Sequence, residues 1–235
     1  MGTRTQTSKQ SELKAPDQSE LKAPDQAGPS EAQFHGSLVE VSGLGVLILG
    51  PSGVGKSECV IELVRRGHCM VADDVVRLRT SDDGARLLGR APESIRHYIE
   101  VRGLGLLCVA DLFGPASVRD ECEVGFVCRL EGWQDGRSYE RIGLERPLET
   151  FLGLSLPTVT LPVQAASNLA TLVELAARDW TLREAGVNAA RRLDDQLRSR
   201  GGFVHATGRS AADSVADAVD TAVGVNRESV EGEGS

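Results

Sequence analysis

The sequence has little of what membrane, secreted or nucleic-acid-binding proteins need. No apolar segment approaches the roughly 18 to 20 residues that span a bilayer, and the polar N-terminus lacks the apolar core of a signal peptide. The formal net charge is −8, the pI is near 5.1, and no polybasic run is present. A nucleic-acid-binding surface normally carries a basic stripe. We therefore expect a cytoplasmic protein that binds neither nucleic acid nor membrane.

The five cysteines lack the spacing of a metal or redox site, since no two of them form a C-x-x-C pair. Most of them lie in apolar runs, which predicts reduced thiols in the core. They are Cys59, Cys69, Cys108, Cys122 and Cys128. With 40% hydrophobic residues, the chain of 235 residues has enough apolar material for one domain or two small ones.

The two ends of the chain differ in composition from its middle. Residues 11–18 (SELKAPDQ) are repeated without change in residues 19–26, and a short polar repeat that contains proline cannot bury much surface. We expect residues 1–32 to form a disordered tail. Small and acidic residues dominate residues 206–235, which we predict to be a second tail. One domain, about residues 33–205, lies between them.

One stretch of this domain specifies a ligand chemistry. Residues 50–57 fit the pattern G-x-x-x-x-G-K-[ST] of a phosphate-binding P-loop. In such a loop glycines allow positive φ, backbone N–H groups point at phosphate oxygens, and the following helix adds its partial positive charge. Apolar residues 46–49 predict the strand before the loop, and residues 57–66 predict the helix after it. A glycine-rich turn without ligand is the alternative. The predicted binding residues are Gly50, Pro51, Ser52, Gly53, Val54, Gly55, Lys56 and Ser57.

Hydrophobic periodicity predicts an α/β domain of short strands and a few helices. A strand at residues 34–41 is expected to turn at Ser42-Gly43 into the strand before the P-loop. Residues 92–100 predict a short helix that begins at Pro92. Two helices are expected at residues 168–180 and 185–200, the first with an apolar stripe that we interpret as core rather than interface. Further strands are expected at residues 69–72, 75–79, 106–109, 123–130 and 158–161.

A P-loop enzyme also needs an acidic group near its metal ion and a group that activates the nucleophile. Lys56 would reach the β and γ phosphates of a nucleotide, and the Ser57 hydroxyl would hold Mg²⁺. Asp73 and Asp74 follow a hydrophobic run about seventeen residues after Lys56, and they are the candidates for the acidic group. Two solvated acids in a turn are the alternative.

The motifs around the P-loop occur in a recognisable order. They are Phe34-His-Gly36, the P-loop followed by Glu58, Arg66-Gly-His68 leading to Ala72-Asp-Asp74, and the run from Ile99 to Cys108. This order resembles the catalytic domain of the HPr kinase/phosphorylase family, bacterial enzymes that phosphorylate a seryl residue of the phosphocarrier protein HPr. Further matches at residues 112–114, 140–144, 161–163, 168–170 and 186–190 extend the resemblance over about residues 34–200.

The resemblance implies a compact α/β fold related to the nucleotide domain of phosphoenolpyruvate carboxykinases. It also implies ATP and Mg²⁺ as cofactors, an HPr-like carrier as substrate, and a homo-oligomer, namely a hexamer. By the same resemblance, Lys56 clamps the β and γ phosphates, and Ser57 and Glu100 hold Mg²⁺. One of Asp73 and Asp74 would accept the proton of the attacking serine hydroxyl, and which of them does so stays open.

Two further residues enter the site only through the resemblance. His35 matches the active-site histidine of the family, and Arg141 matches its catalytic arginine, which would offset charge on the transferred phosphoryl group. Considered alone, they would be interpreted as a structural histidine and a solvated arginine. Glu58 also matches the family, but in the first turn of a helix it favours the helix dipole in any case.

Two features depart from the family pattern. Full-length members carry an N-terminal domain before the histidine, whereas this chain has the repeat tail and resembles the short relatives. In the loop before the penultimate helix the family usually reads Pro-Val-Arg-Pro-Gly-Arg-Asn, and this chain reads Pro162-Val-Gln-Ala-Ala-Ser-Asn168. That loop is associated in the family with phosphorolysis, in which inorganic phosphate attacks phosphoserine-HPr. We therefore expect the kinase reaction with weak or absent phosphorolysis.

The sequence thus predicts an ATP- and Mg²⁺-dependent protein serine kinase that acts on HPr or an HPr-like carrier and regulates carbohydrate metabolism or a phosphotransferase relay. A kinase with another acceptor and a non-catalytic ATP-sensing module are the alternatives. An intact set of functional residues argues against the sensing module. These residues are Lys56, Ser57, Asp73, Glu100 and Arg141.

Overall fold

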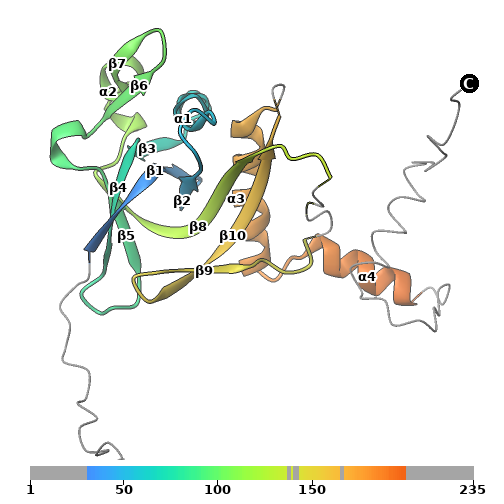
Figure 1. Cartoon of the computed structure of the whole chain (residues 1–235). Coiled ribbons are helices and arrows are strands. Elements are labelled where there is room, and N and C mark those ends of the chain that lie inside the picture. Colours follow the sequence, from blue (N-terminus) through green and yellow to red (C-terminus); the bar gives the residue numbers. More distant parts are fainter. Residues whose placement is uncertain (1–30, 137–138, 140–142, 165–166, 200–235) are drawn as a thin grey trace, which may run out of the picture.

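The computed structural model describes residues 31–136, 139, 143–164 and 167–199. Eight strands form one large sheet, and a two-stranded hairpin lies beside α1 (Figure 1). The large sheet contains β1 (Glu31–Val41), β2 (Leu44–Leu49), β3 (Cys69–Ala72), β4 (Val75–Thr80), β5 (Leu87–Arg90), β8 (Glu121–Gly132), β9 (Leu148–Phe151) and β10 (Leu154–Val163). The hairpin contains β6 (Tyr98–Val101) and β7 (Gly105–Cys108). The helices are α1 (Lys56–Arg65), α2 (Val109–Phe113), α3 (Leu169–Glu184) and α4 (Ala189–Ser199), with 3₁₀ turns η1 (Glu93–Ile95) and η2 (Pro115–Ser117).

Two long strands, β1 and β8, are shared between two layers of the sheet. The first half of β1 pairs with β4, β4 pairs with β5, and β5 pairs with the start of β8. Farther along, β1 pairs with β2 and β3, while β8 pairs with β2 and β10. Strand β9 adds to the far side of β10. Because β2, β8 and β10 run parallel, their carboxyl ends meet at one edge, where ligands bind in many open α/β sheets.

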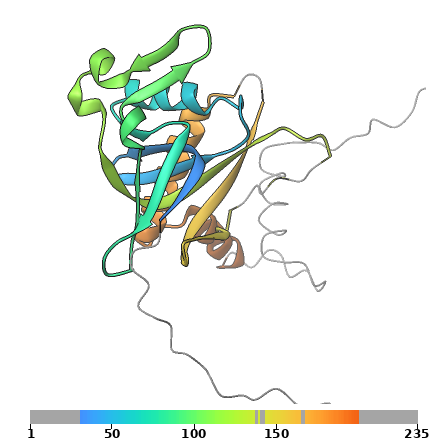
Figure 2. The ribbon, with the colours of Figure 1, turned by 60° about the vertical axis from the view of Figure 1, so that its left-hand side comes forward.

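An apolar core lies on each side of the strand layer that contains β2. The first core lies beneath α1 and α3 and includes the fully buried Ile48, Leu63 and Phe126. The second core lies between the two strand layers and includes Leu38 and Leu47. Figure 2 shows both helices on the same face of the strands. Alternate residues of β2 therefore face different cores, as the pleat of a strand requires.

The tight turn predicted at Ser42-Gly43 is confirmed between β1 and β2. Val41 pairs with Leu44, which leaves Ser42 and Gly43 as a two-residue loop with φ values of 51° and 87°. Positive φ at both positions fits a type I′ turn. The strands predicted from apolar runs are also present, although β8 and β10 extend several residues beyond the predicted bounds. Strand β1 begins at Glu31, two residues before the expected start of the domain at residue 33.

The helix predicted for residues 92–100 is wrong. Only Glu93–Ile95 form a helical turn, and residues 98–101 belong to β6. Pairing with β7 places Glu100 opposite Leu106, so long-range backbone hydrogen bonds replace the helical ones. The last helix begins at Ala189 rather than residue 185, because Gly186, with φ 84°, closes the preceding helix. The sequence pattern does not predict β5, β9 or α2.

The apolar stripe of α3 faces the core, as interpreted from the sequence. Val173 is fully buried within the first core, and Ala170 and Ala177 lie beside it. The five cysteines are free, and four of them are buried. Burial raises the pKa of Cys59 and Cys122 to about 12, so these thiols stay protonated at neutral pH.

None of the helices in the described part of the chain is long and apolar enough to cross a membrane.

Candidate functional site

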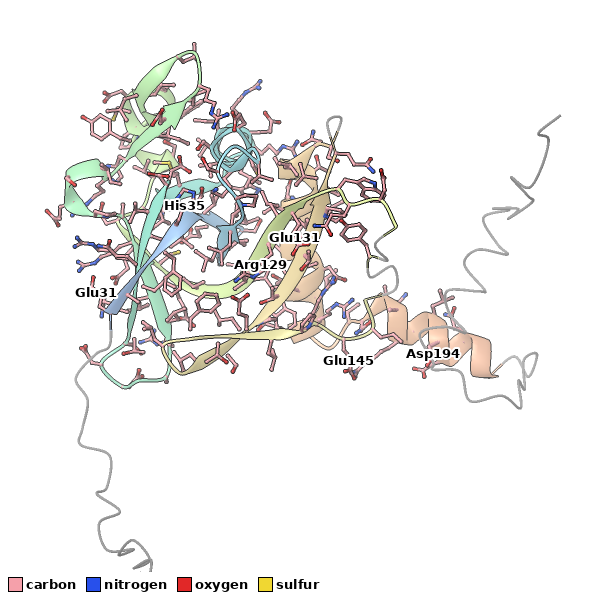
Figure 3. The ribbon with its side chains drawn as sticks, in the orientation of Figure 1. Glu31, His35, Arg129, Glu131, Glu145 and Asp194 are labelled. Carbon is pink, nitrogen blue, oxygen red and sulfur yellow. The ribbon has the colours of Figure 1, made fainter. Side chains whose placement is uncertain are left out.

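Several chain segments meet at the carboxyl edge of the parallel strands. The P-loop follows β2 at Gly50, and Asp73 directly follows β3. Strand β1 runs antiparallel to β2 and pairs Gly36 with Leu49, which brings His35 to the same edge. Figure 3 shows His35 near Arg129 and Glu131, which lie at the end of β8. Residues that are far apart in the sequence thus face one another across this edge.

The P-loop is held between α3 and the β6–β7 hairpin. Gly53 and Gly55 adopt φ values of 79° and 101°, a region that favours glycine. A Cβ atom on Gly53 would lie 3.1 Å from Nη2 of Arg102, and one on Gly55 would lie 3.1 Å from Cδ1 of Leu169. The glycines therefore permit both the backbone conformation and the close approach of neighbouring side chains.

Lys56 is the first residue of α1, and its side chain folds back over the P-loop. Its Nζ atom donates hydrogen bonds to the carbonyl oxygens of Gly50 at 2.9 Å and Pro51 at 3.1 Å. Burial lowers the pKa of Lys56, and the nearby carboxylates of Asp73 and Asp74 oppose that change. The ammonium group is therefore held at the mouth of the loop by neutral carbonyls, which phosphate oxygens are able to replace.

His35 connects Lys56 to Asp74. The Nε2 atom of His35 lies 3.2 Å from Nζ of Lys56, while its Nδ1 atom lies 2.9 Å from the carbonyl oxygen of Asp74 and 3.1 Å from its carboxylate. An ammonium group only donates, so Nε2 accepts, and we assign the ring proton to Nδ1, which donates to Asp74. His35 is thereby oriented by contacts on both ring nitrogens, and its role as an active-site histidine stays a prediction.

Asp73 is buried between two serine hydroxyls. Ser37 Oγ donates to Oδ1 of Asp73 at 2.5 Å, and Ser57 Oγ donates to Oδ2 at 2.7 Å. Only 4% of Asp73 is exposed to solvent. Burial raises the pKa of this carboxyl group, and the hydrogen bonds from the two serines oppose the rise. The carboxylate of Asp73 is therefore a fixed hydrogen-bond acceptor beside Ser57 of the P-loop.

Asp74 lies in a different environment although it is the next residue. Its side chain is 69% exposed, and its backbone has a φ of 67°. The carbonyl oxygen of Asp74 accepts from the backbone N–H of Gly36 at 3.1 Å as well as from His35. Asp is one of the few residues that tolerate this left-handed conformation. The turn thus presents one acid to solvent and encloses the other.

The oxygen atoms of Ser57 and Asp73 fit a Mg²⁺ site by their chemistry. Magnesium prefers oxygen ligands and is usually bound by one or two carboxylates together with substrate phosphates and water. Among the residues that the structure describes, no group of three His, Cys, Asp or Glu side chains is placed to hold a metal ion. Phosphate oxygens would therefore have to complete the coordination of an ion held here.

Glu100, the other predicted metal ligand, is exposed on β6, and its side chain has no hydrogen-bond or ion-pair partner among the described residues. Its neighbour Ile99 is buried in the core beneath α1, and Arg102 lies against Gly53. The hairpin therefore reaches the P-loop through Arg102, and among the described residues no contact joins the Glu100 side chain to Ser57 or Asp73. Arg141, the predicted catalytic arginine, lies outside the described residues.

The structure adds residues that the sequence analysis does not single out. Ser37 is a fully buried hydroxyl in an otherwise apolar part of β1, and that isolated polar position is the available sequence signal. Arg102 contacts the P-loop, and its only signal is its place in the motif from Ile99 to Cys108. Arg129 and Glu131 line a pocket beside Gly50. No local pattern identifies them, because the pocket forms only when distant strands pair.

Substitution of Asp73 by asparagine is expected to stabilise the protein at neutral pH without Mg²⁺. The folded-state pKa of Asp73 lies above its ordinary value of 3.8. The folded state therefore binds this proton more tightly than the unfolded state, and stability falls as the pH rises from the ordinary pKa toward the folded one. The raised pKa of Asp73 therefore lowers the free energy of unfolding at neutral pH, and the asparagine variant, which has no carboxyl proton to lose, avoids this loss.

The measurement is the Tm of wild type and Asp73→Asn between about pH 4 and about pH 8 without divalent ions. The advantage of the variant should grow as the pH rises and then level off. A difference in Tm that is independent of pH, or a wild type that is more stable at the upper end, would contradict the prediction.

The fold and this edge define a mixed α/β protein with a central sheet, in which a histidine and two acids lie beside a loop that has the sequence pattern of a P-loop. The family model described as HPr Serine kinase C-terminal domain matches residues 28–197. The chain belongs to this family.

Curated relatives carry the name HPr kinase/phosphorylase. The protein from Caldanaerobacter subterraneus subsp. tengcongensis is 47% identical over 163 residues, which cover 69% of this chain and 53% of that protein. The protein from Caldicellulosiruptor bescii is 47% identical over 166 residues, with 71% and 53% covered. This chain therefore spans about half the length of the curated relatives it matches.

A solved structure shares the fold. It is titled "Structure of the Hpr(Ser) kinase/phosphatase from Coxiella burnetii", is 30% identical, and aligns with a TM-score of 0.61 over 66% of this chain and 93% of that one. The mixed α/β fold predicted from the sequence is thereby confirmed. The relation to phosphoenolpyruvate carboxykinases stays a prediction.

Proposed function

We propose that this chain is an ATP- and Mg²⁺-dependent protein serine kinase that phosphorylates HPr or an HPr-like carrier. The observation that carries the proposal is the hydrogen-bonded chain from Asp74 through His35 to Lys56, which ends at the P-loop. This chain of contacts places the exposed carboxylate of Asp74 and the ammonium group of Lys56 at the same side of the P-loop. The names of the relatives support HPr as the acceptor. Membership of the family favours an assembly of several copies, for which the hexamer stays the prediction.

The two acids suit different tasks. Asp73 is enclosed with Ser57, so we assign it to the metal side of the site. Asp74 is exposed and held by His35, so we assign it as the group that accepts the proton of the serine hydroxyl. An aspartate is a weak base near neutral pH, but the loose transition state of phosphoryl transfer makes positioning more important than basicity.

The remaining groups stabilise charge. Lys56 would exchange the carbonyls of Gly50 and Pro51 for the β and γ phosphate oxygens of ATP. Mg²⁺, when bound, would neutralise phosphate charge, and Ser57, Asp73 and Glu100 are the side chains assigned to it. Arg141 would offset charge on the transferred group, an assignment that rests on the resemblance alone.

Incubation with Mg·ATP and the HPr of the same cell tests the proposal. We expect one phosphorylated seryl residue on the carrier, detected by mass spectrometry. Binding of ATP without transfer to HPr or to any protein of a cell extract would identify a nucleotide-sensing module instead. Transfer to a different hydroxyl compound would keep the kinase chemistry and replace the acceptor.

We further propose that phosphorolysis is weak in this chain. Two arginines of the family pattern are replaced by Gln164 and Ser167, and residues 165–166 between them lie outside the described residues. Gln164 and Ser167 bond each other in a turn, through N–H to Oγ at 3.1 Å and N–H to carbonyl oxygen at 2.9 Å. Each missing charge-assisted hydrogen bond to a second phosphate would be worth about 1.5 to 3 kcal/mol.

The double substitution Gln164→Arg with Ser167→Arg is therefore expected to raise pyrophosphate release from phosphoserine-HPr and inorganic phosphate by at least about tenfold. The forward rate should change by less than about threefold, since the forward reaction needs no second phosphate. Pyrophosphate release by the unmodified protein at a rate comparable to the forward reaction would refute the proposal.

A further inference from the structure

A pocket of about 410 Å³ adjoins the P-loop on the side of the sheet away from α1. Its position follows from its walls, because Leu49 and Phe34 belong to the core between the strand layers and not to the core beneath α1. The end of β8 forms the remaining wall of the pocket. The lining residues are Phe34, His35, Leu49, Gly50, Pro51, Arg129, Leu130 and Glu131.

The pocket shares its boundary with the phosphate-binding mouth. Gly50 and Pro51 line it, and their carbonyl oxygens hold the ammonium group of Lys56. His35 also lines it and contacts the same ammonium group at 3.2 Å. Because Lys56 is the residue that reaches the β and γ phosphates, the pocket begins where the terminal phosphate of a bound nucleotide would lie.

The geometry of transfer places the acceptor on this side. The attacking and leaving oxygens lie roughly in line with the phosphorus atom, so the acceptor hydroxyl must come from beyond the terminal phosphate. The P-loop backbone and the N-terminus of α1 take the nucleotide phosphates on one face of the strands. Phe34 and Leu49 of the pocket wall lie on the other face. Asp74, which lies 3.1 Å from His35, stands at the boundary between the two.

One part of the wall suits an apolar group, and the polar part is formed by His35, Arg129 and Glu131. Phe34, Leu49 and Pro51 give apolar surface, and the Phe34 ring is fixed by an edge contact with Phe151, with ring centroids 5.3 Å apart. The charge of Arg129 is engaged by Glu149, with Nε to Oε2 at 2.7 Å and a second contact from Nη2 to Oε1. An anion in the pocket would have to compete with that carboxylate, so phosphate is disfavoured.

We propose that this pocket is an acceptor subsite, which takes a bulky apolar side chain next to the phosphorylated serine of the acceptor protein. The inference rests on the proposed kinase function. It assigns the nucleotide and the acceptor protein to opposite faces of the strands, with Lys56, His35 and Asp74 at the boundary.

The kinetic test compares Phe34→Leu and Phe34→Ala with Phe151→Leu, using HPr as acceptor. Phe151 is the matched control, because it loses the same ring contact but does not line the pocket. Losing apolar contact in a binding pocket typically costs tenfold or more, so we expect Phe34→Ala to raise the KM for HPr about tenfold. The KM for ATP should change by less than about twofold. Phe34→Leu, which keeps most of the volume, should lie between wild type and Phe34→Ala.

A double-mutant cycle with the acceptor completes the test. Each residue that flanks the phosphorylated serine of the acceptor is changed to alanine in turn and combined with Phe34→Ala. For the residue that enters the pocket, the two effects on KM should be less than additive because the groups touch. A raised KM for ATP with an unchanged KM for HPr would make the pocket a nucleoside site and overturn the proposal. Equal effects of Phe34→Leu and Phe151→Leu would overturn it as well. A wild type that binds ATP but phosphorylates no acceptor would overturn the kinase function together with this inference.

Discussion

Substitution of Lys56 by methionine is expected to lower kcat/KM for phosphoryl transfer at least about 10³-fold. That loss corresponds to about 4 kcal/mol, the size expected when one charged group that stabilises a developing charge is removed from a dry site. Lys56 is 6% exposed, and among the residues that the structure describes it donates hydrogen bonds only to groups of the P-loop and to His35. Methionine keeps the length of the stem but provides no donor and no charge.

The matched control is Arg65→Met, at the other end of the same helix. Arg65 carries the same charge, is 66% exposed, and pairs with Glu62 on the surface. Exposed pairs of this kind are worth about 0 to 1 kcal/mol, so the control should keep its activity within about twofold. Circular dichroism and Tm verify that both variants are folded. A Lys56→Met protein with more than a tenth of the wild-type rate would contradict the assigned role.

The local part of this site was predictable because it depends on short-range pattern. The glycines, the lysine and the serine of the P-loop lie within eight consecutive residues, and the strand and helix around them follow from their own periodicity. The turn at Ser42 and Gly43 is local in the same sense. Such features need no knowledge of how distant segments pair.

The environments of Asp73 and Asp74 were not predictable, because they are set by another strand. Ser37 of β1 encloses Asp73, and His35 of the same strand holds Asp74. Both contacts depend on the register between β1 and β3, in which Leu38 pairs with Ala72. Two adjacent acids in a turn therefore look equivalent in the sequence and differ in the folded protein.

The error at residues 92–100 has a similar physical cause. Pro92 suits the first turn of a helix, and the following residues contain nothing that forbids one. The competing structure is the hairpin in which Glu100 pairs with Leu106, and its hydrogen bonds come from residues beyond the glycine turn. Tertiary pairing therefore put Glu100 on β6 of the hairpin, whose Arg102 lies against Gly53 of the P-loop.

Asp74→Asn is expected to lower kcat about 10²- to 10⁴-fold, the usual contribution of a positioned general base. The affinity for ATP should change by less than about threefold, since Asp74 is exposed and contacts only His35 and Gly36 in the described structure. Asparagine tolerates the left-handed backbone of this position. The backbone carbonyl oxygen of residue 74 would still accept hydrogen bonds from His35 and from the N–H of Gly36. The variant therefore tests the carboxylate with little change of structure.

Asp73→Asn is the paired measurement, and it is expected to affect the metal requirement instead. Asp73 accepts a hydrogen bond from Ser57, and both residues are assigned to the proposed Mg²⁺ site. The Mg²⁺ concentration that gives half-maximal rate should therefore rise about tenfold or more. At saturating Mg²⁺ the rate of Asp73→Asn should recover most of its loss, whereas the rate of Asp74→Asn should not. Recovery by Asp74→Asn alone would exchange the two roles. If neither change lowers the rate, the turn that separates a buried from an exposed acid is structural, and the transfer reaction takes its base from elsewhere.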